Sequence, residues 1–470
     1  MKTTKYKNSW ILGTTFCLLL VSSCFFTSCD DELDIVPKGK STLENVTDLE
    51  ALLNQEWMLS MPPCEDLGAI CNESLGYSID VPGTMEQDNS LAYAYLTFNE
   101  NVDRKTLATS DSRYEAAYKY INYMNVLISK MPDAEGDSQK KTQCIAEARV
   151  LRAYFHWLLV NIHAKQYDEA TAENEGGIAY VDNTNVGEEK TKLTLAETYR
   201  RILEDCTDEI IAQLPQKESN VERPDQAFGN AVRAKVLMQM KRYSEALPYA
   251  QASLRLNNRI EDRSSCIDNG DWVLSQDAEN NLLYIGNGMR VSPTLEALSM
   301  ETADMFENGD YVNTYTGVWN SMWGSMFCGI PVPLCFSFAV QGNVYGITSD
   351  RMYYTAAECL IRTGKIQDGL QMVDRIRAKR VENYEPFAQG NPSEQQAMAM
   401  LQKAKWIECI GSYENFFDCK RWNTEANYKR TITRDLGEYG KFSISPESPP
   451  WVLPFPSNVT RYNPSMTQNY

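Results

Sequence analysis

Apolar residues recur at the spacing of an α-helix over much of this 470-residue chain, and no other feature constrains the fold as strongly. In residues 114–131, Ala117, Ile121 and Met124 fall on one helical face. Hydrophobic residues make up 43% of the chain, which is enough to bury such faces in a folded core. A mainly α-helical protein is therefore expected. The same spacing predicts further helices over residues 46–54, 145–164, 195–214 and 227–256.

Two segments have the small residues that a closely packed pair of helices needs. In the first, Ala234 and Ala246 flank Tyr243 in an arrangement that resembles a tetratricopeptide repeat. The same spacing separates Ala357 from Gly369 in the second. Any helical hairpin can place small residues where its helices cross, so a plain hairpin remains the alternative. Both interpretations predict pairs of packed helices.

Three segments lack a helical pattern. Residues 62–84 contain several prolines and glycines and no sustained apolar period, so we expect a loop there. Residues 262–345 are rich in Gly, Asn, Trp and Tyr and form a predicted insertion with one short strand at residues 282–285. The tail from Pro446 onward is too rich in proline to be helical and is expected to lie extended across the body. Long irregular segments in helical proteins usually carry function.

The N-terminal residues predict export. Lys2, Lys5 and Lys7 form a basic region, and the apolar run that follows is too short to span a membrane. Small residues then precede Cys29, in a pattern similar to a bacterial lipobox, in which the cysteine is lipidated. An ordinary signal peptide, or cleavage before Cys24, is the alternative. The predicted organisation is a lipoprotein signal peptide, a polar tether and a helical body, over residues 1–28, 29–40 and 41–470.

The charge of the chain excludes several kinds of partner. The formal net charge is −18 at pH 7, and the predicted signal peptide holds lysines but no acidic residue, so the mature chain is more acidic still. Such a surface repels nucleic-acid phosphates and anionic lipids. We therefore expect no nucleic-acid partner, and we expect the chain to meet the membrane through the lipid on Cys29.

Residues suited to catalysis or metal binding are scarce. The two histidines, His156 and His163, lie on one apolar helical segment and are expected to be packing residues. The sequence contains no Cys-x-x-Cys pair and no phosphate-binding glycine loop, so no metal site and no cofactor are predicted. A glycosidase needs only two carboxylates, and composition leaves that class open.

The cysteines of an exported chain can form disulfides. Cys64 with Cys71, and Cys328 with Cys335, are close enough in sequence to be loop disulfides. Cysteines inside the helical patterns, such as Cys359, are expected to be buried free thiols. One or two disulfides at most are predicted.

Several segments resemble those of SusD/RagB outer-membrane lipoproteins, in the same order along the chain. EARVLRAY at residues 147–154 resembles the signature helix of the family, and FFDCKRW at residues 416–422 resembles its aromatic-aromatic-Asp-x-x-Arg-Trp motif. Near Glu408 the family usually repeats a Glu and adds an Arg, where this chain has Ser412 and Asn415, so one internal ion-pair network is expected to differ. The other similar segments are residues 29–37, 353–358, 374–378, 463–464 and 468–469.

The resemblance implies both a function and a fold. Proteins of this family sit on a TonB-dependent outer-membrane transporter at the cell surface, bind oligosaccharides or other nutrients, and perform no chemistry. Their fold is mostly helical, with tetratricopeptide-like pairs as a scaffold and irregular insertions as the ligand surface. The competing interpretation is a surface adhesin or assembly subunit that binds protein. Arg152, Glu358 and Arg421 lie in the similar segments, and we expect them to form buried scaffold ion pairs.

Aromatic residues are the candidate ligand contacts, because sugar C–H faces stack on aromatic rings. The densest cluster lies in the insertion, where Tyr311, Tyr315, Trp319 and Trp323 would align if the segment were helical. A buried core stripe is the alternative. The early irregular stretch is a second candidate, with Asp66, Tyr77 and Asp80.

Overall fold

Helices dominate the part of the chain that the computed structural model describes. Residues Glu44–Tyr470 form one compact unit. The predicted signal peptide, Cys29 and the tether lie outside the described residues. The described residues are 43–54, 61–76, 80–185, 187–218, 220–265, 278–286, 295–311, 313, 318–319, 321–336 and 343–470.

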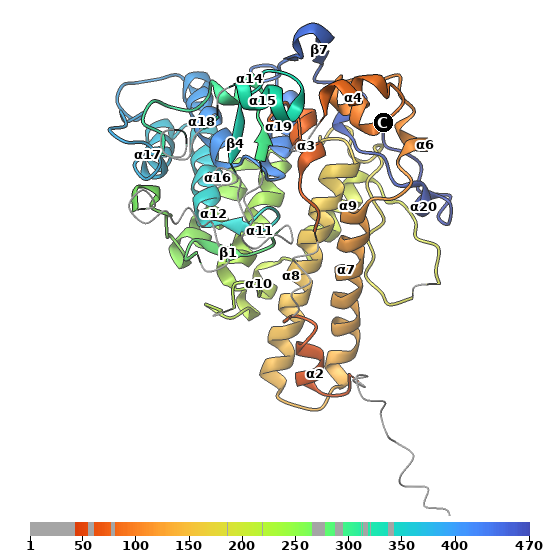
Figure 1. The fold of residues 1–470 in the computed structure, drawn as a ribbon. Coiled ribbons are helices and arrows are strands. Elements are labelled where there is room, and N and C mark those ends of the chain that lie inside the picture. The colour runs from red at the N-terminus through yellow and green to blue at the C-terminus, as the bar shows by residue number, and fades with distance from the viewer. Residues whose placement is uncertain are drawn as a thin grey trace, which may run out of the picture. The chain divides into compact units, whose positions relative to one another are not determined.

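The two longest helices form an antiparallel hairpin. Helix α7 (Ser112–Lys130) and helix α8 (Ser138–His163) run side by side in Figure 1. Asp111 and Asp137 cap them by accepting hydrogen bonds from amides of the first turn. Helix α2 (Val46–Glu50) packs against both. All three helices were predicted, and α8 begins earlier than expected because Asp137 caps its polar first turns.

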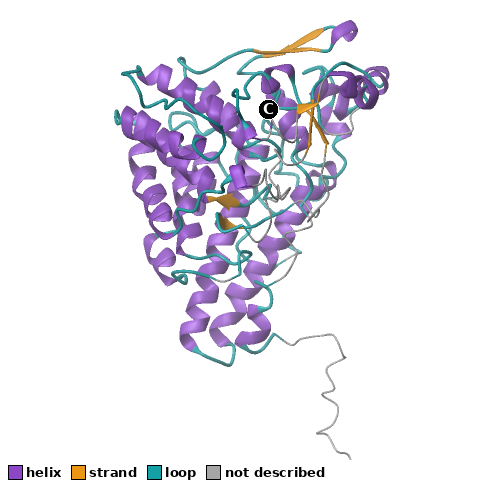
Figure 2. Cartoon of the chain, turned by 60° about the vertical axis from the view of Figure 1, so that its left-hand side comes forward, coloured by secondary structure: helices purple, strands orange, loops and turns teal. Residues whose placement is uncertain are grey.

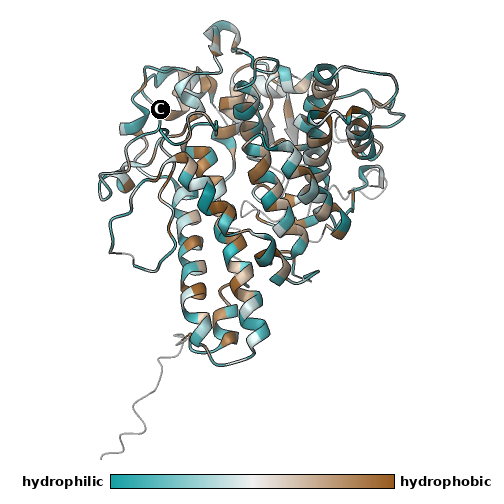
Figure 3. Cartoon of the chain, turned by 180° about the vertical axis from the view of Figure 1, so that it is seen from behind, coloured by the Kyte–Doolittle hydropathy of each residue, from teal (hydrophilic) through white to brown (hydrophobic). Residues whose placement is uncertain are grey.

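Four helices form the two predicted pairs, and the pairs pack against each other. Ala234 and Ala357 are fully buried, as the close crossing requires. A Cβ atom on Gly369 would lie 2.7 Å from the Ala357 carbonyl oxygen, so only glycine fits there. Figure 3 shows polar and apolar residues alternating along the helices, as amphipathic packing requires. The four are α11 (Gln226–Gln239), α12 (Tyr243–Leu256), α16 (Ser349–Arg362) and α17 (Ile366–Arg377).

The single helix predicted over residues 195–214 is wrong. The segment contains two helices, α9 (Leu195–Glu204) and α10 (Asp208–Gln213). Thr207 starts α10 by accepting a hydrogen bond from the Ile210 amide, which breaks the run. The apolar period continues across this break, so the sequence pattern did not reveal it. Two later helices, α18 (Glu394–Glu408) and α19 (Glu414–Asn423), complete the helical layer.

The loop predicted over residues 62–84 is also wrong, because short helices interrupt it. Asp80 caps one of them by accepting a hydrogen bond from the Gly83 amide, and Asn72 ends another in a left-handed conformation. Helices of one to two turns are too short to establish an apolar period. The short helices of this part of the chain are α3 (Glu65–Cys71), α4 (Val81–Glu86), α5 (Leu91–Leu96) and α6 (Arg104–Leu107).

The strands are short, as Figure 2 shows, and those in the described residues form three small antiparallel sheets. Strand β1 (Asn281–Leu283), predicted at residues 282–285, pairs with β5 (Ile347–Thr348). Strands β6 (Ile432–Asp435) and β7 (Lys441–Ile444) form a hairpin. The third sheet has the order β2–β4–β3, with β2 at Leu295–Ala297, β3 at Val318–Trp319 and β4 at Leu334–Phe336.

The described part of the insertion also contains short helices, which its composition did not predict. They are α14 (Met300–Ala303) and α15 (Ser321–Cys328). Short 3-10 helices occur at Met131–Asp133, Arg263–Ser265, Gly437–Tyr439 and Pro449–Trp451.

The tail lies along the body as predicted, although helix α20 (Ser457–Thr460) interrupts it. The Leu453 amide donates to the Ile162 carbonyl, 3.0 Å away, at the end of α8. Further along, the Asn469 Nδ2 group donates to the carbonyls of His163 and Gly177, each 2.8 Å away. These bonds join the C-terminal residues to the central helices.

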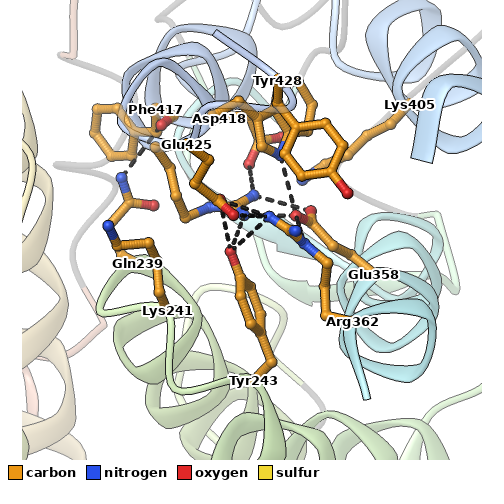
Figure 4. Close-up of polar contacts among 12 residues, drawn as sticks. Gln239, Lys241, Tyr243, Glu358, Arg362, Lys405, Phe417, Asp418, Glu425 and Tyr428 are labelled. Carbon is orange, nitrogen blue, oxygen red and sulfur yellow. Dashed lines mark hydrogen bonds and ion pairs between the residues drawn. The ribbon is translucent and has the colours of Figure 1, made fainter. Parts of the chain in front are cut away.

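Buried ion pairs hold the later helices together, which confirms the scaffold interpretation of Arg421 and Glu358. Arg421 donates to both carboxylate oxygens of Glu358, at 2.5 and 2.9 Å, and to Asp418 at 2.8 Å. Figure 4 shows Glu358, Asp418 and Lys405 converging from three helices. Arg152 plays the corresponding part on α8 and donates to Asp205 at 2.6 Å. These charges are neutralised inside the scaffold and are not presented to a ligand.

Both histidines are packing residues, as predicted. His156 lies between the Arg152 carbonyl, 2.8 Å from Nδ1, and the Val181 amide, 3.0 Å from Nε2. His163 is fully buried, and its ring stacks on Phe455. Burial lowers the pKa of His156 to about 3 and that of His163 to about 4.

The predicted loop disulfides do not form. Cys64 and Cys71 are free and lie at opposite ends of α3, which places about 10 Å between them, beyond the reach of a disulfide. Cys328 is free as well. Buried Cys359 confirms the expectation for cysteines in helices. Within the described residues, no cluster of His, Cys, Asp and Glu could hold a metal ion, and no helix is long and apolar enough to cross a membrane.

Candidate functional site

The two regions predicted to contact a ligand meet in one place. Leu75 and Val81, from the early stretch, share a hydrophobic core with Val332 and Leu334 from the insertion. The Leu75 amide donates to the Ala297 carbonyl, 2.7 Å away in β2. We call the surface formed by α3, α4, α15 and the β2–β4–β3 sheet the insertion face. Segments far apart in the sequence thus present one surface.

Close contact fixes α4 against the end of α15. Gly329 follows α15 with a φ of +76°, and a Cβ atom there would lie 2.5 Å from Pro82 Cδ. Any other residue would push Pro82 away, so this approach depends on glycine. Asp80, which the sequence suggested as a ligand contact, lies one residue before α4 and is exposed. Its carboxylate accepts from the Gly83 amide at 3.1 Å, so Asp80 helps to position α4.

The aromatic residues of the insertion do not align on one helix. Trp319 lies in β3, opposite Leu334 of β4, whereas Trp323 lies in α15. Tyr311 is half-buried, and its amide donates to the Arg380 carbonyl at 2.9 Å. Tyr315 and Tyr77 lie outside the described residues. The expectation of a single stripe is therefore wrong, although Trp319 and Trp323 both belong to the insertion face.

Exposed apolar side chains mark this face, and the sequence reasoning missed them. Met326 and Phe327, on α15, are 66% and 49% exposed. Helix α15 has the sequence SMWGSMFC, which contains no charged residue, although its core contact uses only part of its surface. That composition was the signal that could have identified the helix. Grouped apolar exposure of this kind is typical of a binding surface.

Asp66, another early candidate, forms an ion pair inside the protein. Both of its oxygens accept hydrogen bonds from Arg113 of α7, at 3.0 and 2.6 Å. Arg113 is 4% exposed, so the pair fastens α3 to the long hairpin. Its role is to hold the insertion face in place.

Arg434 of β6 connects the β6–β7 hairpin to α3 and α5. Its guanidinium donates to the Asn72 side chain at 3.0 Å, to the Tyr95 and Leu96 carbonyls at 3.0 and 2.8 Å, and to the Ala69 carbonyl. Burial lowers the pKa of Arg434 to about 9. The hydrogen bonds go to carbonyl and amide oxygens, which satisfy the donors but do not neutralise the charge. The β6–β7 hairpin is thereby attached to α3 and α5.

Glu73 connects the insertion face to the turn before α19. It accepts from the Gly411 amide at 2.8 Å and from the Asn415 amide group at 2.6 Å. Burial raises the pKa of Glu73 to about 7. Asn415 is one of the two residues at which the chain departs from the SusD/RagB pattern, and this contact is its role here. Glu408 keeps its ion pair with Arg380, 2.8 Å away.

Two clefts lie away from the insertion face, and neither was predicted. The first, of about 470 Å³, lies between α7, the loop after α8 and the tail, and Tyr114, Tyr118 and Met466 line it. The second, of about 700 Å³, lies between the end of α19, the loop after α8 and the tail, and Lys420, Asn423 and Trp451 line it. Their walls come from segments distant in sequence, which explains why no local pattern revealed them.

Family models match both parts of the chain that flank the insertion. A model described as "Starch-binding associating with outer membrane" matches residues 33–238, and the SusD family model matches residues 350–470. No curated protein matches the sequence significantly.

Solved structures have the same fold. A SusD superfamily protein from Bacteroides thetaiotaomicron aligns with a TM-score of 0.68 at 16% identity, over 91% of this chain and 100% of that one. A SusD superfamily protein from Bacteroides vulgatus aligns with a TM-score of 0.66 at 14% identity, over 91% and 99%. A SusD-like carbohydrate binding protein from the same species aligns with a TM-score of 0.59 at 13% identity, over 90% and 97%. At such identities the structural likeness shows the fold, and the family models show the membership: the chain belongs to the SusD/RagB family, whose members are binding proteins and not enzymes.

Proposed function

We propose that this protein captures carbohydrate at the outer membrane and that the insertion face is its ligand surface. The exposed apolar side chains of α15, on a face held in place from three sides, are the observation that carries the proposal. Sugars offer C–H faces that stack on such side chains, and a surface fixed before binding costs little ordering entropy. The family description of starch binding at the outer membrane, and the carbohydrate-binding relative, support the same ligand class.

The family resemblance supports a proposal for the place of this protein in uptake. Lipidation at Cys29 would hold the chain on the outer membrane at the cell surface. There it would deliver oligosaccharide, or another nutrient, to a TonB-dependent transporter. Co-purification of a transporter with the tagged protein from outer membranes tests the partnership, and Cys29→Ala tests the anchor. Release of the Cys29→Ala protein from the membrane fraction is the expected result.

Calorimetric titration after a glycan array tests ligand capture. Trp319→Ala, Trp323→Ala and Phe327→Ala should each weaken oligosaccharide binding about tenfold, because each removes apolar contact area. Tyr462→Ala is the matched control, since Tyr462 is an exposed aromatic residue of the tail, at 71% exposure. Unchanged affinity in all three face variants, with native circular dichroism, would place the ligand elsewhere.

The same binding experiments separate this proposal from the rival functions. An adhesin or assembly subunit would bind a protein firmly and no glycan. A glycosidase would release reducing sugar during long incubation with the bound oligosaccharide. We expect saturable glycan binding without release.

A further inference from the structure

The larger cleft, of about 700 Å³, has the size of a small-ligand site. We call it the tail cleft, because residues 446–452 of the tail form one wall. Trp451 belongs to that wall, and its ring stacks on Phe416 of α19 at 5.8 Å between centroids. Val452 adds further apolar surface. Helix α19 contributes polar side chains to the lining.

Lys420 is the first of these polar side chains, and it is a buried ammonium group without an acidic partner. It is only 4% exposed, and Nζ donates to the carbonyls of Asn161 at 2.5 Å and Ala164 at 2.7 Å. Two of its three N–H donors are therefore used. Its nearest aromatic ring, Phe416, lies 5.4 Å away. Within the described residues, no carboxylate forms an ion pair with it. The charged form of Lys420 thus has backbone carbonyls and no acidic side chain beside it.

Asn423 is the second polar side chain that α19 contributes to the cleft. It lies three residues after Lys420 on α19, so both side chains fall on the same helical face. Its side chain is buried, at 8% exposure for the residue, and Nδ2 has no hydrogen-bond partner in the described structure. Leaving a buried donor without an acceptor is unfavourable, and such a group calls for a partner that the protein chain does not supply. Lys420 and Asn423 together need an acceptor that carries negative charge.

We propose that the tail cleft binds the carboxylate of a sugar acid. Carboxylate oxygens accept from Lys420 and Asn423, whereas the apolar wall at Trp451 packs against the sugar ring. The cleft is separate from the insertion face, so it is a second site. The carboxylate follows from the donors of the cleft, and the saccharide part rests on the proposed function.

The ionisation of Lys420 supplies an independent readout. Burial lowers the pKa of Lys420 to about 7, and a bound carboxylate favours its charged form, so binding near neutral pH should take up a proton. Calorimetry in two buffers of different ionisation enthalpy measures that uptake. The charged or titratable groups that line the cleft or face Lys420 are His163, Lys165, Asp168, Lys429, Glu447 and Tyr470.

The test uses D-galacturonate as the probe, with glucose and acetate as comparison ligands, on the full mature protein. Saturable galacturonate binding with proton uptake is expected, at least tenfold tighter than binding of glucose or acetate. Lys420→Met and Asn423→Leu should each weaken it at least tenfold. Asn423→Leu removes no hydrogen bond of the fold, so it stays interpretable if Lys420→Met unfolds. Lys130→Met, on the exposed end of α7, is the matched control and should leave affinity within twofold.

Several results would overturn the assignment. Galacturonate binding that persists unchanged in Asn423→Leu would show that the ligand does not bind in the tail cleft. Equal affinity for acetate would show that the cleft does not recognise the sugar ring. Absence of galacturonate binding would show that sugar acids are not its ligands. Failure of the proposed function looks different: neutral oligosaccharide capture would then be unchanged in Trp323→Ala, where a tenfold loss is expected, while galacturonate binding would still depend on Asn423.

Discussion

At the scale of single residues, the pair of Glu358 and Arg421 shows how this protein uses charge in its interior. Both side chains are fully buried. Burial raises the pKa of Glu358, but the Arg421 guanidinium more than offsets this and lowers it to about 2. Removing one partner would leave a buried charge with too few compensating contacts. The pair therefore holds α16 and α19 in register, and it contributes to specificity of packing more than to net stability.

Arg421→Met is predicted to lower the free energy of unfolding by about 3–5 kcal/mol, because it leaves the Glu358 carboxylate buried without its main partner. The double variant Glu358→Leu/Arg421→Met should recover a large part of that loss. Urea denaturation at pH 7 measures both. Arg200→Met is the matched control, since Arg200 forms an exposed pair with Glu197 and its loss should change the free energy of unfolding little. A loss as small in Arg421→Met as in the control would contradict the prediction.

His156 makes the stability depend on pH in a defined direction. Its folded pKa of about 3 lies below its ordinary value of 6.5, so below pH 6.5 the unfolded chain binds a proton that the folded chain does not. The contribution of neutral His156 to the free energy of unfolding is fully present above pH 6.5. It is lost as the pH falls below that value, by about 1.4 kcal/mol per pH unit. His156→Gln keeps a donor and an acceptor without titrating. Urea denaturation at pH 7, 5.5 and 4.5 should show a shallower fall for this variant, and equal slopes would exclude the assignment.

At the scale of elements, the β6–β7 hairpin depends on Arg434 for its attachment. Arg434→Met leaves the carbonyls of Ala69, Tyr95 and Leu96 without their donor, and it should release the hairpin before the rest of the chain unfolds. Hydrogen exchange read by mass spectrometry should then show faster exchange in β6 and β7. Exchange in α8 should not change.

Lys441→Met is the control for that experiment, because Lys441 lies on the same hairpin in an exposed pair with Asp435. Exchange in this variant should match that of the wild type. Faster exchange spread evenly over all helices of Arg434→Met would show a general loss of stability and would argue against a local clamp.

Long elements could be predicted from the sequence, and short ones could not. Helices α7, α8, α11 and α12 each repeat their apolar period over several turns, so periodicity revealed them, whereas the spacing of Ala357 and Gly369 indicated α16 and α17. Helices α3 and α4 make too few turns for a period. The break between α9 and α10 depends on one capping residue, Thr207, inside a continuous apolar pattern. Local chemistry outweighed periodicity at each of these places.

The sequence indicated a candidate region but not its geometry. Aromatic density predicted a ligand surface within residues 311–323, and the alignment of the four rings assumed one continuous helix, whereas Trp319 lies in a strand. Strand β3 ends at Trp319 and α15 begins at Ser321, so the rings fall in different elements. The roles of Asp66 and Asn415 depend on partners far away in the sequence, Arg113 and Glu73. No local pattern contains that information.

At the scale of the whole molecule, the tail makes the central hairpin part of a single cooperative unit. Ending the chain at Ser445 would remove the bond from the Leu453 amide to Ile162 and those from Asn469 to His163 and Gly177. It would also expose His163 and the apolar end of α8. We expect the truncated protein to melt at least 10 °C lower, because several buried contacts are lost together. Tyr462→Ala, an exposed change within the same tail, should leave the melting temperature unaltered. Calorimetry distinguishes the possibilities: a truncated chain that melts in one transition at the wild-type temperature would show that the tail only covers the body, whereas an early, separate transition would show that it stabilises α8.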